Sequence, residues 1–135
     1  MAKTFMLELV TPERMLFHDV VEAVRAPGVQ GSFGVLAGHA PLLTELEVGL
    51  IKLSLITGEE AYIATSGGFL QVKKDKVIIL ADSAELSDEI NIEQARQDAA
   101  NARQQLAVPG IDAAAVQKSL QHAMNRIRVA EMKSR

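Results

Sequence analysis

Residues 51–81 read IKLSLITGEEAYIATSGGFLQVKKDKVIILA, and this stretch establishes the fold class of the first part of the chain. Short runs rich in Val, Ile and Leu are separated by glycine-containing turns and by a Lys-Asp turn. Within residues 51–55, apolar and polar side chains alternate, which is typical of a strand with one buried face. We therefore expect strands over residues 51–55, 61–65, 69–73 and 76–81.

The preceding residues continue this pattern. Phe5, Leu7 and Leu9 alternate with the residues between them and predict a first strand, and residues 15–17 and 20–26 are further candidates. Pro27 and Gly28 should end the last of these strands, and a loop should then lead to a strand over residues 33–36. Many short strands at near-regular spacing predict an antiparallel sandwich or barrel, whose edge strands should be covered.

The hydrophobic period changes after residue 88. Asn91 can cap a helix, with Gln94 in the capping-box position, and Pro109-Gly110 and a second cap at Asp112 separate this helix from another. The short connection predicts an antiparallel pair. The apolar stripes are Ile92, Ala95, Ala99, Ala102 and Leu106 in the first helix, and Val116, Leu120, Ala123, Ile127 and Ala130 in the second.

The alanine-rich seam buries little surface per residue, so we expect the hairpin to be marginally stable and able to detach. The predicted architecture is an all-β sandwich or barrel over residues 1–86, followed by a C-terminal helical hairpin over residues 87–135.

Composition narrows the function classes. The 135 residues are 48% apolar but only 4% aromatic, so the core must be mainly aliphatic. A formal net charge of −3 argues against a nucleic-acid partner. The absence of cysteine removes disulfides, thiolate nucleophiles and cysteine metal sites. Because no apolar run approaches the roughly 20 residues of a spanning helix, we expect no direct membrane insertion.

Charge is divided unevenly along the chain. Residues 1–88 carry seven basic and twelve acidic side chains, whereas residues 89–135 carry seven basic and five acidic ones. A mildly basic hairpin on an acidic body suits docking on an acidic partner. An ordinary solvated helix face explains the same residues equally well.

The candidate catalytic and ligand-binding residues are isolated. His39 has no Ser or Asp at a distance that suggests a triad, so a packed or interface histidine is the better interpretation. His18 and His122 do not have the spacing of a zinc site. Residues 66–69, Ser-Gly-Gly-Phe, lack the Lys-Ser/Thr ending of a P-loop and are better explained as a turn with close backbone approach. We therefore predict no catalytic residue and no metal site.

Several stretches are more specific when they are taken together. They are Val10-Thr11-Pro12, the Gly-x-x-x-Gly-His-Ala-Pro-Leu pattern of residues 34–42, Ser66-Gly67-Gly68-Phe69-Leu70 with Val72, Val77-Ile78-Ile79-Leu80-Ala81, and residues 123–130, AMNRIRVA. In this order and over the whole length, the chain resembles the epsilon subunit of the bacterial F-type ATP synthase.

The resemblance implies a non-catalytic subunit at the foot of the central stalk of a proton-translocating complex. Its implied partners are the gamma subunit, the ring of c subunits, and the beta and alpha subunits. The sandwich would help couple rotation of the c ring and gamma to ATP synthesis. The helices, when extended, would inhibit ATP hydrolysis by touching an acidic loop of a beta subunit. The implied location is peripheral, on the cytoplasmic face of the plasma membrane.

The resemblance also implies roles for individual residues. The interface with the c ring and gamma would contain Gly28, Gly31, Ser32, Phe33, Gly38, His39 and Pro41. In the family a Glu can occupy the position of Ser32, so an ion pair with the ring is in doubt there while the docking is not. The inhibitory contact with beta would contain Lys118, Arg126 and Arg128.

Some relatives bind ATP through an Ile/Leu-Asp-x-x-Arg-Ala motif at the start of the first helix. The gapless match at residues 90–95 has Asn for Asp and Gln for Arg, and a two-residue shift restores an acid and an arginine at Glu93 and Arg96. Since charge-assisted bonds from Arg to phosphate would supply much of the affinity, we expect no resident cofactor. Regulatory ATP at Glu93, Arg96 and Arg126 is the less favoured interpretation.

Two alternatives of other classes remain open. One is a small-ligand-binding β-domain whose helical hairpin senses nucleotide, and it predicts saturable ATP binding by the isolated chain. The other is a hydrolase using His39, and it predicts turnover that His39→Ala abolishes.

Overall fold

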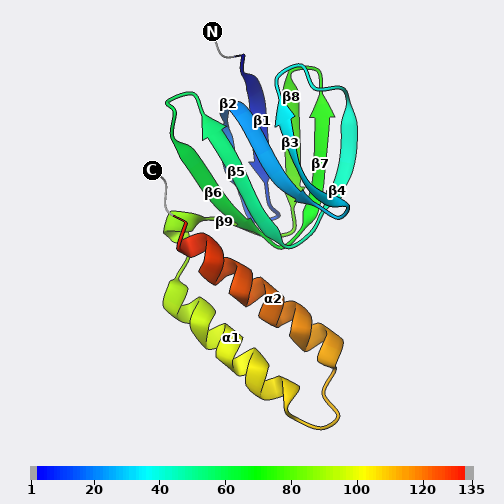
Figure 1. Cartoon of the computed structure of the whole chain (residues 1–135), viewed down its shortest axis with the longest axis vertical. Coiled ribbons are helices and arrows are strands. Elements are labelled where there is room, and N and C mark those ends of the chain that lie inside the picture. Colours follow the sequence, from blue (N-terminus) through cyan, green and yellow to red (C-terminus); the bar gives the residue numbers. More distant parts are fainter. Residues whose placement is uncertain (1–2, 133–135) are drawn as a thin grey trace.

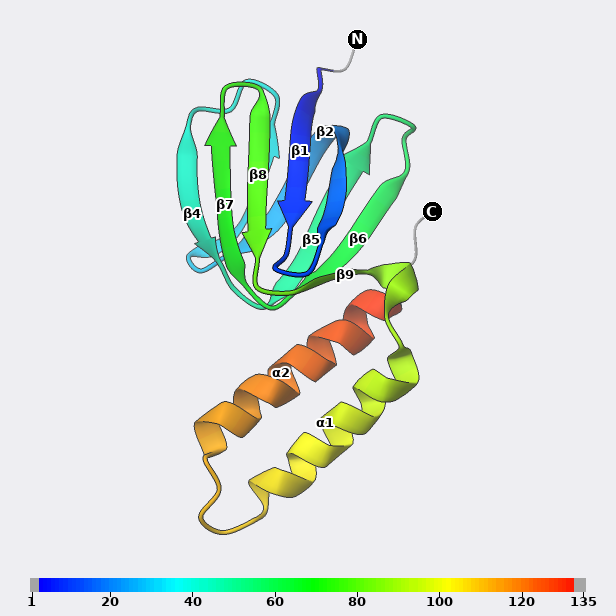
Figure 2. The same ribbon diagram turned by 180° about the vertical axis from the view of Figure 1, so that it is seen from behind.

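The computed structural model describes residues 3–132 and shows a β-sandwich with a helical hairpin packed beneath one of its ends (Figures 1 and 2). The elements of this described part are β1 (Phe5–Val10), β2 (Met15–Gly28), β3 (Gly31–Leu36), β4 (Leu42–Leu46), β5 (Gly49–Leu55), β6 (Glu60–Thr65), β7 (Gly68–Lys73), β8 (Lys76–Ala81), β9 (Ala84–Leu86), the short 3-10 helix η1 (Ser87–Glu89), α1 (Ile92–Leu106) and α2 (Ala113–Ala130). The predicted fold class is confirmed.

The long strand β2 joins the two layers of the sandwich. Its first half pairs with β1, beside β8, β7 and β4, and its second half pairs with β3 and β5, beside β6 and β9. The register on β5 shifts between Val21 and Ala23, a β-bulge that bends the strand from one layer into the other (Figure 2).

The core lies between these layers and is almost entirely aliphatic. Phe5, Leu7 and Leu9 are buried on one face of β1, as their alternation predicts, and Ile51 and Leu53 are fully buried on β5. The largest fully buried side chains are Leu7, Leu9, Ile51, Leu53, Ile63, Leu70, Ile79, Val21, Val24, Val35, Val77 and Val129.

The prediction that all pairings are antiparallel is wrong in one place. β1 pairs in parallel with β8, with Leu7 opposite Val77 and Leu9 opposite Ile79. The pattern of each strand shows only which face is buried. Because the two strands are about seventy residues apart, no turn between them reveals their relative direction.

The predicted break at Pro27-Gly28 is also wrong. β2 continues through both residues, and Val29 and Gln30 form the turn into β3, so Gly31, Ser32 and Phe33 belong to a hairpin strand and not to a loop. The Pro27 carbonyl accepts from the Glu47 amide, on the side where the pairing of β2 with β5 has already ended at Arg25. The missing Pro N–H faces that side too, so it removes no ladder bond.

Two short strands were missing from the sequence prediction. β4 carries Thr44 and Glu45 and buries only Leu46, and β9 has three residues. Both owe their strand geometry to pairing with distant partners, β4 with β7 and β9 with β6. Local composition therefore could not identify them.

The helices begin where their caps predict. The Asn91 side chain accepts from the Gln94 amide, and the Asp112 side chain accepts from the Ala115 amide. α1 buries Ala95, Ala99 and Ala102 as predicted and ends at Leu106, shortly before the predicted stop at Pro109-Gly110.

The buried stripe of α2 differs from the prediction. Val116, Ala123 and Ala130 are buried as expected, but Leu120 and Ile127 are only partly buried, and Asn125 and Val129 are buried instead. The reason is that α2 packs against the sandwich as well as against α1 (Figure 1), and a single helical period describes only one contact face.

No helix within residues 3–132 is long and apolar enough to cross a membrane.

Candidate functional site

The hairpin joins the sandwich through a small apolar contact. Its buried members are Ala64 on β6, Ile90 before α1, and Val129 and Ala130 at the end of α2, and Leu50, Tyr62 and Ile92 pack around them. This cluster is separate from the sandwich core. Because this apolar contact is small, polar groups determine the orientation of the hairpin relative to the sandwich.

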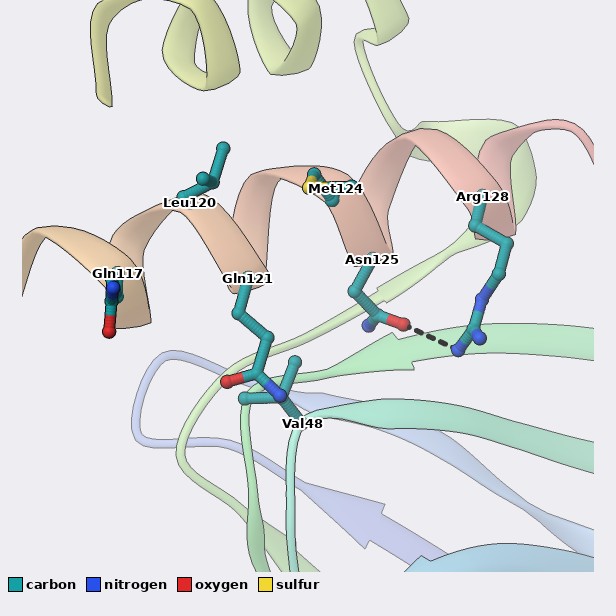
Figure 3. Close-up of a pocket in the computed structure, with 7 residues that line it drawn as sticks. All are labelled: Val48, Gln117, Leu120, Gln121, Met124, Asn125 and Arg128. Atoms are coloured by element: carbon teal, nitrogen blue, oxygen red, sulfur yellow. Dashed lines mark hydrogen bonds between the residues drawn. The ribbon is translucent and has the colours of Figure 1, made fainter. Parts of the chain in front are cut away.

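Asn125 is the central polar group of this junction (Figure 3). It is buried, and its Nδ2 donates to the Gly49 carbonyl at 2.9 Å, while its Oδ1 accepts from Arg128 Nη2 at 2.9 Å. The residue therefore ties α2 to the first residue of β5. Truncation would leave the Gly49 carbonyl without this donor, so Asn125 orients the hairpin as well as filling space.

A shallow groove runs between α2 and the base of the sandwich next to Asn125 (Figure 3). Its volume is about 490 Å³, and it is lined by Val48, Gln117, Leu120, Gln121, Met124, Asn125 and Arg128. The groove is open, and its side chains include neither an acid nor a histidine. Its side chains are therefore those of an open surface next to the contact between α2 and the sandwich.

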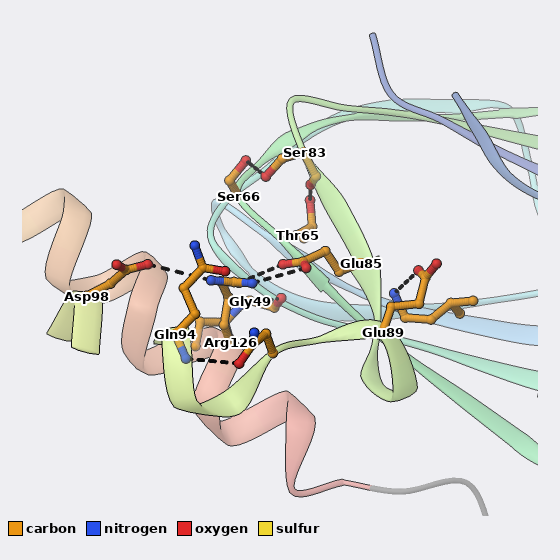
Figure 4. Close-up of polar contacts among 12 residues, drawn as sticks. Gly49, Thr65, Ser66, Ser83, Glu85, Glu89, Gln94, Asp98 and Arg126 are labelled. Carbon is orange, nitrogen blue, oxygen red and sulfur yellow. Dashed lines mark hydrogen bonds and ion pairs between the residues drawn. The ribbon is translucent and has the colours of Figure 1, made fainter. Parts of the chain in front are cut away.

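Arg126 makes the most extensive ionic contact of the junction (Figure 4). Its Nε and Nη2 donate to the two carboxylate oxygens of Glu85 at 2.6 and 3.1 Å, and its Nη1 lies 3.7 Å from Asp98 Oδ2. The side chain is 13% exposed, so the pair is only weakly screened by water. One guanidinium thus connects β9, α1 and α2.

A second bidentate pair holds the connection between sandwich and hairpin. Arg14, in the turn between β1 and β2, donates through Nη1 and Nη2 to Glu89 of η1 at 2.9 and 2.8 Å. The hydrogen bond from Arg14 lowers the pKa of Glu89 and raises the pKa of Arg14, and the Leu86 amide also donates to Glu89. Both side chains are well exposed, so this pair contributes less than its geometry suggests.

His122 lies on α2 one turn before Arg126. Burial lowers its pKa, and the positive charge of Arg126 lowers it further, against weaker opposing effects of Glu85 and Asp98. It lines an open groove between the helices, together with Asp98, Asn101, Ala102, Gln105, Ser119, Ala123 and Arg126. The neutral imidazole is therefore the favoured form in this arrangement.

The predicted inhibitory residues do not form one free cationic patch. Lys118 and Arg128 are exposed, but Arg126 is turned toward the sandwich and paired with Glu85. Glu93 and Arg96, predicted for the ATP alternative, are exposed and pair with each other at 3.0 Å within the first turns of α1. Arg126 instead forms ion pairs with Glu85 and Asp98.

The residues predicted to contact the c ring and gamma fall into two groups at opposite ends of β3. Gly28, Gly31, Ser32 and Phe33 surround the β2–β3 turn, and Gly38, His39 and Pro41 lie between β3 and β4. β3 has six residues, a span of about 20 Å. The structure therefore does not bring the two groups together.

Local contacts account for the conformation of each group. At Gly28 a Cβ would lie 2.8 Å from the Gly31 carbonyl oxygen and 2.9 Å from the Phe33 ring, so the turn packs too closely for a side chain. His39 is exposed, and its Nδ1 lies 2.7 Å from the Ala40 carbonyl, an arrangement that places the ring proton on Nδ1.

Sequence reasoning missed an apolar patch on the outer face of β4, β7 and β8. Leu43, Phe69 and Leu80 are 66%, 50% and 55% exposed. Phe69 lies directly opposite Leu80 on one side and Glu45 on the other, and Leu43 is two residues before Glu45 on β4. The available signal was Val77-Ile78-Ile79-Leu80, which is apolar at every position and so must have an outward apolar face.

The Ser-Gly-Gly segment uses its polar groups internally (Figure 4). The Ser66 amide donates to the Ser83 carbonyl, the Gly67 amide donates to Thr65 Oγ1, and Ser83 Oγ donates to Ser66 Oγ at 2.7 Å. The prediction of a turn with close backbone approach is confirmed, since a Cβ at Gly68 would lie 2.1 Å from the Leu80 carbonyl oxygen.

Across residues 3–132 no group of three or more His, Asp or Glu side chains is placed to hold a metal ion. The groups that the structure does bring together are the apolar patch of β4, β7 and β8 and the polar contacts of α2.

Comparison with known proteins gives consistent results. Residues 4–87 match the family described as "ATP synthase, Delta/Epsilon chain, beta-sandwich domain". The ATP synthase epsilon chain of Desulforamulus reducens is 41% identical over 133 residues, covering 97% of this chain and 100% of that protein. The sodium-ion-specific ATP synthase epsilon chain of Propionigenium modestum is 43% identical over 130 residues, covering 95% and 94%.

Two solved structures have the same fold. A chain of the Euglena gracilis mitochondrial ATP synthase, OSCP/F1/c-ring in rotational state 1, aligns with a TM-score of 0.79 at 23% identity, covering 96% of this chain and 82% of that one. A chain of the central stalk and c-ring of the Tetrahymena thermophila mitochondrial ATP synthase aligns with a TM-score of 0.60 at 14% identity, covering 96% of both.

Proposed function

This chain belongs to the family of ATP synthase epsilon chains, and from that membership we propose that it is a non-catalytic rotor subunit with two separable tasks. The sandwich attaches to the rotor and helps couple rotation of gamma and the c ring to ATP synthesis. The hairpin restrains ATP hydrolysis when it leaves the sandwich and reaches the catalytic subunits. The subunit is peripheral, and we place it on the cytoplasmic face of the plasma membrane.

The observation that carries this proposal is the small size of the joint between sandwich and hairpin. Four buried apolar residues, of which two are alanines, form the joint together with a few polar contacts. The sandwich has its own, much larger core. A part with this little apolar attachment can separate without unfolding the part that stays.

The sandwich offers three surfaces for attachment to the rotor. The apolar patch Leu43, Phe69 and Leu80 is the most suitable for a stable contact with gamma, because burial of exposed apolar side chains drives association. The β2–β3 turn with Ser32 and the segment with His39 lie at the two ends of β3 and can touch different neighbours. We assign these ends to the c ring and gamma.

The hairpin offers positive charge for the inhibitory contact. Lys118, Arg126 and Arg128 lie on α2, and Arg side chains form the most directional pairs with carboxylates. We propose that they bind the acidic loop of a beta subunit, with alpha beside it, when the hairpin is extended.

The test is the ATPase activity of the matching catalytic complex lacking this subunit. Full-length chain and a version ending at Ser87 are added at equal concentration, and binding is measured alongside hydrolysis. Both versions should bind, and only the full chain should inhibit. Binding by neither version would contradict the assignment of partners, and equal inhibition by both would contradict the role of the hairpin.

We also propose that the chain works without a resident cofactor. Glu93 pairs with Arg96, and Arg126 pairs with Glu85, so each arginine of the ATP alternative already has an acidic partner. Titration calorimetry of the isolated chain with ATP should show no saturable heat at millimolar ATP. Saturable binding that Arg96→Ala and Arg126→Ala each remove would favour a nucleotide-sensing hairpin instead.

A further inference from the structure

Within the chain, the guanidinium of Arg126 faces two carboxylates. Its Nε and Nη2 edge faces the carboxylate of Glu85, and its remaining nitrogen, Nη1, faces Asp98 (Figure 4). A guanidinium is a planar fork, and the edge that binds one carboxylate in a bidentate pair cannot bind another at the same time. Arg126 therefore cannot offer its Nε/Nη2 edge to an external acid while that edge holds Glu85.

Glu85 is well placed to control this choice. It lies on β9, which pairs with β6 at Ala64 opposite Glu85, so its backbone belongs to the sandwich and does not move with the hairpin. Its side chain is 31% exposed, against 13% for Arg126, so water reaches the pair mainly at Glu85. Such a pair is strong enough to hold the helix and can still be broken.

A neighbouring hydrogen bond links the Arg126–Glu85 pair to the rest of the contact between α2 and the sandwich. Asn125, next to Arg126 in sequence, donates to the Gly49 carbonyl. These two bonds attach consecutive residues of α2 to two different strands, β5 and β9. When α2 leaves the sandwich, both contacts must break, so the strength of the Arg126–Glu85 pair contributes to the population of the detached hairpin.

We propose that Glu85 is an internal competitor for the inhibitory arginine. In the folded-down arrangement Glu85 occupies Arg126 and keeps it from the catalytic subunits, and an acidic surface of the partner engages Arg126 only after this pair has separated. The competition rests on the proposed inhibitory role of the hairpin, whereas the pair itself does not. Glu85 thereby sets the threshold at which the subunit inhibits hydrolysis.

The first experiment uses the isolated full-length chain and needs no partner. Hydrogen exchange of the α2 amides is compared in the wild type, Glu85→Gln, Arg126→Gln and the double variant. Gln keeps the shape of Glu and removes its charge, so Glu85→Gln should raise exchange of α2 about tenfold and leave the sandwich strands unchanged. Because the two residues act as a pair, the double variant should exchange no faster than either single variant.

The matched control is Glu93→Gln. Glu93 also pairs with an arginine, at 3.0 Å, but the pair is exposed and lies within α1. Its loss should leave exchange of α2 at the wild-type rate. Unchanged exchange in Glu85→Gln would overturn the proposal, and protected sandwich amides in every variant establish that the fold is retained.

The second experiment measures inhibition of the matching catalytic complex by the same variants. Glu85→Gln should inhibit at a severalfold lower concentration than the wild type, because Arg126 is released, and Arg126→Gln should inhibit more weakly. Faster exchange of α2 in Glu85→Gln together with wild-type inhibition would overturn the competition and leave the proposed function standing. Unchanged inhibition by Arg126→Gln would instead remove the docking role of Arg126, and with it the competition, whatever the exchange data show.

Discussion

Gly68 is the glycine at which an added methyl group should reduce the stability of the fold most. The residue begins β7 with φ +141°, and a Cβ there would lie 2.1 Å from the Leu80 carbonyl oxygen and 2.8 Å from the Ala81 Cα. Both contacts are with backbone, so no side chain can rotate away. Gly68→Ala therefore combines an unfavourable backbone conformation with a contact that only movement of β7 or β8 can relieve.

The expected cost follows from adding these two effects. A non-glycine residue in this region of φ costs about 1–3 kcal/mol, and overpacking of a close contact costs about 1–3 kcal/mol more. The sum, roughly 2–6 kcal/mol, is a large part of the roughly 5–15 kcal/mol that stabilises a typical domain. Gly68→Ala should thus be severely destabilised or fail to fold.

Gly58→Ala is the matched control. Gly58 also has positive φ, +90°, but nothing lies within 4 Å of where its Cβ would be. Gly58→Ala should therefore lose only the free energy that the unfavourable backbone conformation costs, about 1–2 kcal/mol. The free energy of unfolding from urea titration, followed by circular dichroism of the strands, measures both variants. Equal losses of about 1 kcal/mol in the two variants would refute the reasoning, because the contact with Leu80 would then cost nothing.

Three further predictions concern docking and pH. Phe69→Ala should weaken binding of the full chain to the rotor about fivefold, since the exposed half of the ring can contribute about 1 kcal/mol. Ile56→Ala truncates an exposed apolar side chain between β5 and β6, outside the three proposed docking surfaces, and should leave binding unchanged; binding to the catalytic complex measures both variants. Burial, and secondarily the charge of Arg126, lowers the pKa of His122 below its ordinary value of 6.5. The unfolded chain therefore binds the proton more readily, and the free energy of unfolding should fall as pH drops below about 6.5. In His122→Gln this fall, measured by urea titration between pH 5 and 7, should be smaller. The hydrogen bond from Arg14 lowers the pKa of Glu89 below its ordinary 4.5. The pair therefore stabilises the fold above about pH 4.5, and this stabilisation is lost as pH falls through the lowered pKa. Glu89→Gln should remove that part of the acid dependence of the melting temperature, and an unchanged dependence in thermal denaturation would contradict the prediction.

The parts of the fold that were predictable rest on contacts between near neighbours. The caps at Asn91 and Asp112 bond to amides three residues later, so sequence alone identifies them. The turn between β7 and β8 at Lys74-Asp75 is equally local. The resemblance to the epsilon subunit added the family, which the comparisons confirm.

The candidate site was less predictable because its contacts join distant residues. The family resemblance implied an inhibitory role for Arg126, but its partner Glu85 is 41 positions away and was not singled out. Asn125 lies on α2, where no local pattern predicts burial, yet it is buried and donates to a carbonyl 76 residues away. Ser32 and His39 are close in sequence but lie at opposite ends of β3, a separation that only the structure shows.

By itself, the sequence determined that a β-rich first part of the chain is followed by a capped helical pair, because period, caps and glycine turns act over a few residues. Only the tertiary structure decided which strands are neighbours, that β1 runs parallel to β8, and that Phe69 and Leu80 lie together on an outer face. It also decided that the arginine of α2 is held by an acid of β9. These outcomes depend on side chains brought together by chain closure over dozens of residues, which no local pattern encodes.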